Sequence, residues 1–486
     1  MTVSEATHLE VLIVGAGLSG IDAAVHISRA FPAKNYALLE QRDELGGTWS
    51  LFKYPGIRSD SDMYTLGFGF RPWDGRNAIA DGPDILRYLR ETATEYGVDK
   101  QIRYNRKATD YAWSSEDRFW TVTVENTATG ETETLTADFL VSTSGYYNYE
   151  AGYTPQWDGL DDYRGRLVHP QHWPEDLDYT GKRVVVVGSG ATAVTLIPSM
   201  ARDAGHITML QRTPTYIVSQ PRVDPIAQTL KKTLPRSLAA RAIHARYAAV
   251  TIGFYEFCRR SPKVAKVLLK RWAKLHLPDD FDYDTHLTPP YDPWDQRLCV
   301  IPGADLFKAI HSHKVDVVTD HIEKFTETGI RLKSGQELEA DIVVTATGLD
   351  VIPMGGASIE VDGEKVDLGK TFTYKAMMLS GIPNFAFIVG YTNASWTLKA
   401  DLVCEYVVRL LEHMDQHNLK VAAPRQEEGL EPAPLLDLES GYLQRAAGRL
   451  PLAGDRDPWR LKHNWYFDKK FLRGSSVDDG VMEFAD

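Results

Sequence analysis

The sequence predicts an α/β protein in which one parallel-sheet unit is inserted into another unit of the same type. A short apolar segment followed by a glycine-rich turn occurs twice, at residues 11–20 and 183–193. A third apolar segment with a terminal glycine, residues 341–348, follows much later in the chain. A chain of 486 residues also exceeds the length at which one hydrophobic core usually keeps growing, so at least two domains are expected.

The first glycine-rich turn has the strand–turn–helix context of a dinucleotide site. Residues 11–14 (VLIV) indicate a buried parallel strand, residues 15–20 (GAGLSG) the turn, and residues 19–30 a helix whose positive end faces a pyrophosphate. A second strand, residues 36–39, ends at Glu40, where a carboxylate can bind ribose hydroxyl groups. This order predicts a site for FAD or NAD. Its expected binding residues are Gly15, Gly17, Ser19, Gly20 and Glu40.

The second glycine-rich turn repeats the pattern with a different residue at the ribose position. Residues 183–187 (RVVVV) precede the turn 188–193 (GSGATA), a helix to about residue 200 and a strand at residues 207–210. Gln211 replaces the acid, and Arg212 follows it. An arginine attracts a 2′-phosphate that a carboxylate would repel, so this unit is expected to bind NADP; a solvated surface arginine is the alternative. Its expected binding residues are Gly188, Ser189, Gly190, Ala191, Thr192, Arg212 and Thr213.

Two similar segments mark where the chain passes between the units. Residues 341–348 (DIVVTATG) resemble residues 141–145 (VSTSG), and small residues there permit a tight crossing close to a cofactor, which adds Thr347 and Gly348 to the site. We therefore expect two Rossmann-like dinucleotide-binding domains, the NADP domain inserted in the FAD domain. The expected boundaries are 1–148 and 345–486 for the FAD-binding domain, 149–344 for the NADP-binding domain and 222–280 for a helical insertion within it.

The amino-acid composition argues against several classes of protein. Hydrophobic residues make up 43% and charged residues 25% of the chain, which is ordinary for a globular protein. The three cysteines have no paired spacing, which argues against disulfides, a redox dithiol or a zinc site, and no metal is expected. The start MTVSEATHLE lacks the basic region of a signal peptide, and no run approaches the roughly 20 apolar residues of a membrane span. We expect a cytoplasmic enzyme.

Two further stretches resemble known fingerprints. Residues 46–49 (GGTW), 54–56 (YPG) and Asp60 resemble the long fingerprint of the Baeyer–Villiger monooxygenases, which are class B flavoprotein monooxygenases. Residues 163–174 (YRGRLVHPQHWP) are similar to the shorter fingerprint, with Tyr163 and Pro170 in place of the usual Phe and Thr. The resemblance covers essentially the whole chain and implies bound FAD, NADPH as reductant and dioxygen as co-substrate. Stretches similar to a mycobacterial group within the family are residues 60–66, 169–178, 293–297 and 393–401.

The resemblance also implies roles for single residues. Asp60 should pair with an active-site arginine, which by position is Arg297. A guanidinium does not deprotonate, so Arg297 can stabilise negative charge during oxygen transfer. A helix cap is the alternative for Asp60, and a structural role the alternative for Arg297. The other residues expected to contact cofactor are Gly47, Thr48, Trp49, Tyr64, Ala108 and Asn393, of which Thr48, Tyr64 and Ala108 rest on family position alone.

Three positions leave alternatives open. Gln296 stands where much of the family has a lysine that reaches the 2′-phosphate, so Arg212 should carry most of a weaker NADPH preference. The family uses the residues matching His169 and Trp173 to couple domain movement to catalysis, but a structural histidine is an equal alternative. The start of the expected helix 398–413, after Asn393, could stabilise anionic flavin or simply cap a core helix.

The helical insertion is strongly basic. Residues 222–274 hold thirteen basic and two acidic residues, whereas the whole chain has a net charge of −12. Five apolar residues at helical spacing predict an amphipathic helix: Ile243, Tyr247, Val250, Phe254 and Phe257. We expect a subdomain packed over the substrate entrance; a peripheral contact with an anionic membrane is the alternative. Nucleic-acid binding is not expected, because no recognisable module is present.

The expected activity is NADPH- and oxygen-dependent conversion of small apolar ketones to esters or lactones, with oxidation of thioethers or thioamides to S-oxides. One alternative is an N- or S-oxygenating flavin monooxygenase without ester-forming activity. A disulfide reductase would need two nearby cysteines, which the sequence lacks. An NADPH-binding protein that has lost its flavin is the non-enzymatic alternative.

Overall fold

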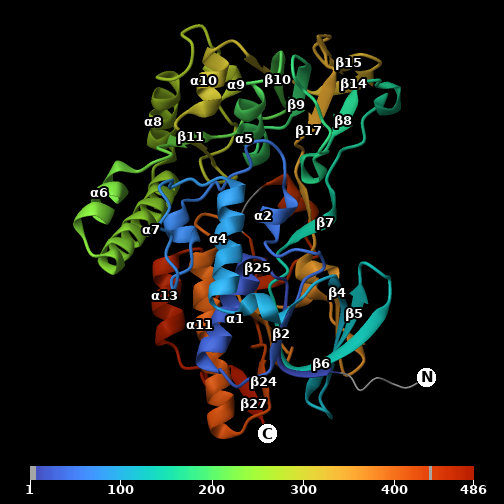
Figure 1. The fold of residues 1–486 in the computed structure, drawn as a ribbon, viewed down its shortest axis with the longest axis vertical. Coiled ribbons are helices and arrows are strands. Elements are labelled where there is room, and N and C mark those ends of the chain that lie inside the picture. The colour runs from blue at the N-terminus through green and yellow to red at the C-terminus, as the bar shows by residue number, and fades with distance from the viewer. Residues whose placement is uncertain (1–6, 437–439) are drawn as a thin grey trace.

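The computed structural model describes residues 7–436 and 440–486, which form two lobes, each built on a parallel sheet (Figure 1). The first six residues, on which part of the signal-peptide expectation rests, lie outside the described ranges.

The larger sheet has eleven strands and contains the first predicted dinucleotide unit. β1 (Thr7–Val14) lies between β2 (Tyr36–Leu39) and β6 (Thr132–Ser142), all parallel, with Val11 opposite Tyr36. Helix α1 (Leu18–Ala30) follows the glycine turn. The predicted strands and helix are thus confirmed, although β1 begins four residues before the apolar run.

The smaller sheet has five parallel strands in the order β13-β10-β9-β17-β8. β9 (Arg183–Val187) and β10 (His206–Gln211) flank helix α5 (Ala191–Met200) in sequence, as predicted. β17 (Ile342–Thr345) pairs with β9. The two outer strands are β8 (Arg166–Val168) and β13 (Val315–Thr319).

The chain passes between the lobes through a two-stranded ribbon. β7 (Tyr147–Gly152) leaves the larger sheet and pairs antiparallel with β18 (Leu349–Val351), which leads back to it. After β18 the chain rejoins the larger sheet at β19 (Ser358–Val361). One unit is therefore inserted in the other, as the two similar crossing segments predicted.

The sequence reasoning missed an antiparallel extension of the larger sheet. β4 (Arg106–Ser114) and β5 (Phe119–Asn126) form a meander with β6. Its face buries Trp120 completely, so the extension has a core of its own. On the other side of the sheet, α1 packs against α11 (Thr397–His417).

The remaining elements connect or cover the two sheets. The other α-helices are α2 (Thr48–Leu51), α3 (Met63–Leu66), α4 (Gly82–Glu95), α6 (Pro225–Thr233), α7 (Arg236–Arg260), α8 (Pro262–Lys274), α9 (Tyr283–His286), α10 (Asp305–His311), α12 (Gly441–Arg445) and α13 (Trp465–Gly474). The other strands are β3 (Ile102–Arg103), β11 (Ile217–Gln220), β12 (Cys299–Pro302), β14 (Ile322–Thr326), β15 (Gly329–Leu332), β16 (Glu337–Glu339), β20 (Glu364–Lys365), β21 (Thr373–Tyr374), β22 (Met378–Leu379), β23 (Phe385–Phe387), β24 (Val421–Pro424), β25 (Pro432–Pro434), β26 (Leu452–Gly454) and β27 (Met482–Ala485).

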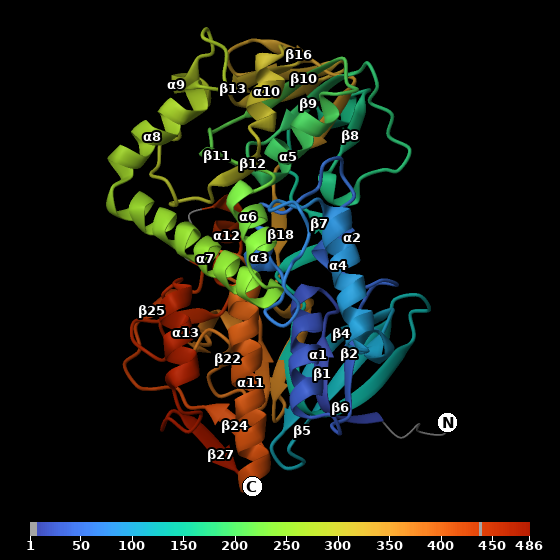
Figure 2. The same cartoon turned by 60° about the vertical axis from the view of Figure 1, so that its left-hand side comes forward.

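The insertion consists of α6, α7 and α8, and α7 and α8 form an outer arm on the left of Figure 2. Of the predicted apolar stripe of α7, Ile243 is buried and Tyr247, Phe254 and Phe257 are partly buried, but Val250 is 57% exposed, so that position was wrong. The buried residues of α7 are Ala239, Ile243, Ala248, Ile252 and Cys258. Among the described residues, no helix combines the length and apolar character that a bilayer crossing requires.

Candidate functional site

A cavity of about 1130 Å³ lies where the carboxyl ends of the two parallel sheets meet. Both glycine turns line it, as do the ribbon residues that join the lobes. Its volume slightly exceeds the usual range of a single-ligand pocket, which suits two cofactors and a substrate. Parallel α/β sheets bind their ligands at this edge.

The first glycine turn has no room for a side chain at Gly15 or Gly20. Gly15 has φ +109°, and a Cβ there would lie 2.7 Å from the carbonyl oxygen of Thr143. At Gly20 a Cβ would lie 1.9 Å from the carbonyl oxygen of Gly15, so Gly20 closes the turn without lining the cavity. The open backbone at the start of α1 therefore fits a pyrophosphate.

Glu40 ends β2 inside the fold at the edge of the cavity. Its side chain is buried, and its carboxylate accepts hydrogen bonds from the backbone N–H of Ala16 at 3.0 Å and of Arg42 at 3.1 Å. Burial raises the pKa of Glu40 above its ordinary value. The glycine turn itself thus positions the carboxylate next to a ribose site.

The second glycine turn has the same geometry but a different neighbour. Gly188 has φ +142°, and a Cβ there would lie 2.3 Å from the carbonyl oxygen of Ala346. Gln211 does not line the cavity: it is buried and its Nε2 donates to the carbonyl of His286 at 2.6 Å. Arg212 is exposed and lines the cavity, as predicted. Lys333, another cation in the cavity wall, was not predicted.

Asp60 and Arg297 bring one charged group from each lobe together. Nη2 of Arg297 lies 2.9 Å from Oδ1 and 2.8 Å from Oδ2 of Asp60. The carboxylate of Asp60 raises the pKa of Arg297 above its already high ordinary value, so the guanidinium stays protonated. The helix cap that was the alternative for Asp60 is formed by Asp62, which accepts a hydrogen bond from the backbone N–H of Thr65.

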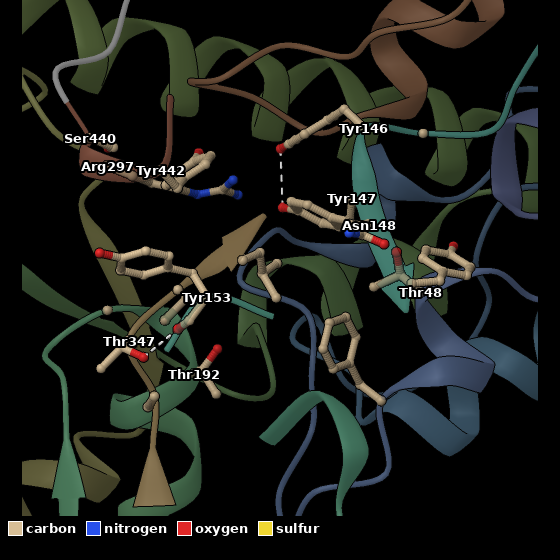
Figure 3. Close-up of a pocket in the computed structure, with 18 of the residues that line it drawn as sticks. Thr48, Tyr146, Tyr147, Asn148, Tyr153, Thr192, Arg297, Thr347, Ser440 and Tyr442 are labelled. Carbon is tan, nitrogen blue, oxygen red and sulfur yellow. Dashed lines mark hydrogen bonds between the residues drawn. The ribbon is translucent and has the colours of Figure 1, made fainter. Parts of the chain in front are cut away.

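Tyr146, Tyr147, Tyr153 and Tyr442 line the cavity together with Arg297 (Figure 3). The hydroxyl groups of Tyr146 and Tyr147 are 3.1 Å apart, and the ring of Tyr146 stacks on Trp396 with centroids 5.5 Å apart. Burial raises the pKa values of Tyr146, Tyr147 and Tyr442, so all three hydroxyls stay neutral. Sequence reasoning missed them. The run 146–149 (YYNY), directly after the crossing segment 141–145, was the available signal.

The cavity brings together most of the predicted site residues. Those that line it are Gly15, Gly17, Ser19, Glu40, Gly47, Thr48, Trp49, Asp60, Ala108, Gly188, Ser189, Gly190, Ala191, Thr192, Arg212, Thr213, Arg297, Thr347 and Gly348.

Two further predicted residues besides Gly20 lie outside the lining. The ring of Tyr64 packs against Tyr247 of α7, with centroids 5.2 Å apart, and against the ammonium group of Lys231. The side chain of Asn393 is buried and donates to the carbonyl of His463 at 2.9 Å.

His169 lies beneath the ribbon that joins the lobes. Its Nδ1 accepts a hydrogen bond from the backbone N–H of Gln171 at 3.2 Å, and a Cβ at Gly152 would lie 2.0 Å from its ring. Burial lowers the pKa of His169, which keeps the ring neutral. Its Nε2 is buried without a hydrogen-bond partner, and both roles considered for His169 stay predictions.

Comparisons with known proteins agree with this geometry. A family model described as flavin-binding monooxygenase-like matches residues 74–235, and a model described as an NAD(P)-binding Rossmann-like domain matches residues 13–81. Among solved structures, a steroid monooxygenase bound to NADP has a TM-score of 0.79 at 21% identity, covering 99% of this chain and 100% of that one. OTEMO in complex with FAD and NADP has a TM-score of 0.77 at 21% identity and the same coverage. At these identities the likeness concerns the fold.

Curated relatives are much closer in sequence. The FAD-containing monooxygenase EthA of Mycolicibacterium smegmatis is 52% identical over 480 residues, which span 98% of this chain and 97% of that protein. EthA of Mycobacterium tuberculosis is 51% identical over 481 residues, 98% of both chains. Full-length identity of this degree, together with two glycine cradles opening on one cavity, shows that the chain belongs to the family of FAD-containing monooxygenases.

Proposed function

We propose that this FAD-containing, NADPH-dependent monooxygenase inserts one oxygen atom beside a ketone carbonyl, giving an ester or lactone, and also oxidises the sulfur of thioethers or thioamides. The Arg297–Asp60 ion pair carries this proposal, because it fixes a cation inside the cavity at the junction of the two lobes. When bound, FAD would supply the redox chemistry, because it accepts electrons from NADPH and activates dioxygen for the transfer of one oxygen atom.

The two cofactors would occupy opposite cradles of the cavity. FAD would lie at the turn containing Gly15 and Gly17 with its ribose at Glu40, and NADPH at the turn containing Gly188 with its 2′-phosphate at Arg212. With this division, residues 1–148 and 345–486 form the FAD-binding domain and residues 149–344 the NADP-binding domain. The closed cradles at Gly15 and Gly188 support the placement.

Arg297 would act where negative charge develops on the substrate oxygen. Attack on a ketone carbonyl places charge on that oxygen, and a permanent cation held in place beforehand stabilises it without reorganisation. Asp60 orients the guanidinium through Nη2. Tyr146, Tyr147 and Trp396 provide an aromatic wall that favours an apolar substrate and limits water. Oxidation of sulfur develops no such carbonyl charge, so it should depend less on Arg297.

Product analysis tests the proposal directly. The FAD-loaded protein is incubated with NADPH and ¹⁸O₂, with cyclohexanone in one set and methyl phenyl sulfide in another, and the products are identified by mass spectrometry. We expect a lactone and a sulfoxide, each with one ¹⁸O atom. Sulfoxide without lactone would favour the N- or S-oxygenating alternative, and the absence of both would contradict the proposal.

The basic insertion supports a second part of the proposal, a peripheral contact with an anionic lipid surface. Eight of the large apolar side chains that are exposed lie in this segment: Ile226, Leu234, Leu238, Val250, Val264, Val267, Leu268 and Leu275. On α8, Val264, Val267 and Leu268 share the solvent-facing side with exposed Arg271 and Lys274. Apolar and basic residues on one exposed helix face match the interface of a membrane with acidic headgroups.

Vesicle flotation at low salt separates this contact from ordinary surface exposure. We expect the protein to float with vesicles containing phosphatidylglycerol and much less with neutral phosphatidylcholine vesicles. Leu268→Glu should reduce flotation, whereas Leu167→Glu, at an exposed leucine outside the insertion, should not. Equal recovery with both kinds of vesicle would remove the membrane contact.

A further inference from the structure

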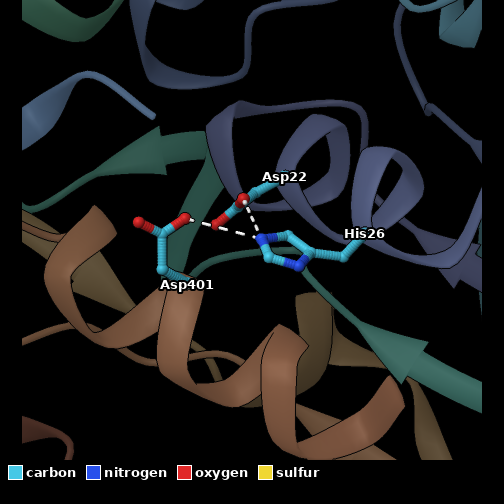
Figure 4. A group of neighbouring side chains, drawn as sticks. All are labelled: Asp22, His26 and Asp401. Atoms are coloured by element: carbon cyan, nitrogen blue, oxygen red, sulfur yellow. Dashed lines mark ion pairs between the residues drawn. The ribbon is translucent and has the colours of Figure 1, made fainter. Parts of the chain in front are cut away.

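A cluster of three ligand-type side chains lies between α1 and α11, apart from the cavity (Figure 4). Asp22 and His26 lie one turn apart on α1, and Asp401 lies on the facing side of α11. Nε2 of His26 is 3.5 Å from Oδ1 of Asp22 and 3.7 Å from Oδ1 of Asp401. None of the three lines the cofactor cavity.

The atoms that face one another in this cluster lack ordinary partners. The Asp22 side chain is fully buried, and neither of its oxygens has a hydrogen-bond partner. The same is true of Nε2 of His26 and Oδ1 of Asp401. Buried polar atoms in proteins are almost always hydrogen-bonded, and an unpaired buried carboxylate is costly. Four inward-facing atoms without partners therefore point to a cation-binding site.

The separations match those between ligands of a metal ion better than those of hydrogen bonds. Hydrogen bonds between nitrogen and oxygen span about 2.7 to 3.2 Å. Two tetrahedral ligands bound to Zn²⁺ at about 2.0 to 2.2 Å lie about 3.3 to 3.6 Å apart. The 3.5 Å distance from His26 falls in that range and the 3.7 Å distance lies just above it, and the three ligand atoms are all within 4.8 Å of one another.

The two carboxylates of the cluster have His26 as their shared ion-pair partner. Within the described part of the chain, no lysine or arginine forms an ion pair with Asp22 or Asp401. A Cβ at Gly69 would lie 3.0 Å from Oδ2 of Asp401, so this glycine makes room for the carboxylate.

We propose that Asp22, His26 and Asp401 bind one divalent transition-metal ion, best matched by Zn²⁺, which clamps α1 to α11. One imidazole and two carboxylates form a zinc ligand set, with a water molecule as the fourth ligand. The side chains of His26 and Asp401 are each 22% exposed, which gives the ion a route from solvent. The expectation of no metal came from cysteine spacing, which does not bear on a site of carboxylates and histidine.

The clamp would hold together two helices that meet again at the cofactor cavity. α1 begins at the first glycine turn, and Trp396, just before α11, donates from Nε1 to Oγ of Ser19 at 2.7 Å. The ion would thus fix the same pair of helices about one turn further along, near the same ends. Its function would be structural, so metal binding and thermal stability test it independently of monooxygenase activity.

The test uses the FAD-loaded full-length protein, treated with EDTA and desalted. Zinc chloride is added by equilibrium dialysis, bound zinc is measured by plasma mass spectrometry, and thermal unfolding is followed with and without the ion. We expect one Zn²⁺ per chain and a midpoint of unfolding raised by about 2 °C or more. His26→Gln and Asp401→Asn should lose both effects.

Two further variants distinguish binding from misfolding. Asp22→Asn should lose zinc while the metal-free protein stays at least as stable as the wild type, because the buried charge is gone. His8→Gln is the matched control, since exposed His8 pairs with Asp138 at 3.1 Å and should not affect zinc binding. Flavin absorbance confirms that each variant is folded. Equal zinc content in the wild type and the three cluster variants, or no stoichiometric zinc in the wild type, would overturn the proposal.

Discussion

The two parallel sheets end at one cavity with the same backbone and different chemistry. In the larger sheet the strand after the first helix ends in Glu40, whose carboxylate turns inward to the N–H of Ala16. In the smaller sheet Gln211 at that position bonds away from the cavity to His286, and the next residue, Arg212, faces the cavity. We therefore propose that nucleotide choice depends on the position and the direction of one side chain on a shared backbone.

The two glycine turns have the same geometry because each is packed against one of the two crossing segments. The carbonyl oxygen of Thr143 blocks a side chain at Gly15, and that of Ala346 blocks one at Gly188. Each blocking residue belongs to one of the two similar small-residue segments of the sequence. The same arrangement, a crossing segment packed against a glycine turn that can hold a cofactor, therefore occurs twice in the molecule.

The largest effects are expected when one of these two glycines at a time, Gly15 or Gly188, is replaced with alanine. Gly15→Ala should prevent FAD incorporation, because Cβ would clash with backbone that cannot move aside. Gly188→Ala should keep FAD and lower kcat/KM for NADPH by about 100-fold or more, as an estimate from the loss of several phosphate hydrogen bonds. Flavin absorbance and steady-state kinetics measure the two effects.

A control isolates the clash from backbone strain. Gly181 also has positive φ, at +68°, but a Cβ there would meet nothing within 4 Å. Gly181→Ala should therefore keep both cofactors. If Gly15→Ala binds FAD as the wild type does, the first cradle is placed wrongly.

Replacing Arg212 tests the difference between the two ribose positions and should have a smaller effect on activity. Arg212→Ala should raise the KM for NADPH by about 10- to 100-fold, since a charge-assisted hydrogen bond contributes about 1.5 to 3 kcal/mol. The KM for NADH should not change, because NADH lacks the 2′-phosphate. Arg202→Ala, at an exposed arginine of the same lobe, is the control. An equal rise for both nucleotides would assign Arg212 a structural role.

The smallest effect is expected from a comparison of two neighbouring carboxylates of the larger lobe, Asp60 and Asp62. Asp60 pairs with Arg297, whereas Asp62 caps α3, and burial raises the pKa of Asp62 to about 6. A carboxyl group with a raised pKa in the folded state holds its proton there while the unfolded chain loses it. Its contribution to stability is therefore lost as pH rises from about 4 to about 6.

Asp62→Asn should remove this pH dependence and keep the cap, because an amide oxygen can also accept the hydrogen bond from Thr65. We expect the stability of the variant relative to the wild type to rise by about 1.4 kcal/mol from pH 5 to pH 7.5, because the folded-state pKa of about 6 lies one unit above pH 5. Thermal unfolding of both proteins at the two pH values measures the difference. A gain that shrinks as pH rises would contradict the assignment.

The sequence allowed prediction of the parts that local chemistry determines. Glycines between an apolar strand and a helix predicted both cradles, and the resemblance of the fingerprint paired Asp60 with Arg297 across 237 positions. The tyrosines at 146, 147 and 442 could not be assigned, because their meeting depends on how the ribbon and α12 fold over Arg297. Val250 was misassigned because helical spacing alone does not show which apolar side chains of α7 face the rest of the protein: Ala248 and Ile252 are buried on either side of exposed Val250.

The ion pair at the junction is the central claim, and replacing Arg297 with alanine tests it most directly. NADPH oxidation, ester yield and hydrogen peroxide are measured together with cyclohexanone as substrate, and Arg445→Ala, at a cavity arginine over the ring of Tyr153, is the control. We expect Arg297→Ala to keep oxidising NADPH while ester formation falls by about 100- to 1000-fold and peroxide accounts for the electrons. Ester formation at the wild-type rate would contradict the role of Arg297.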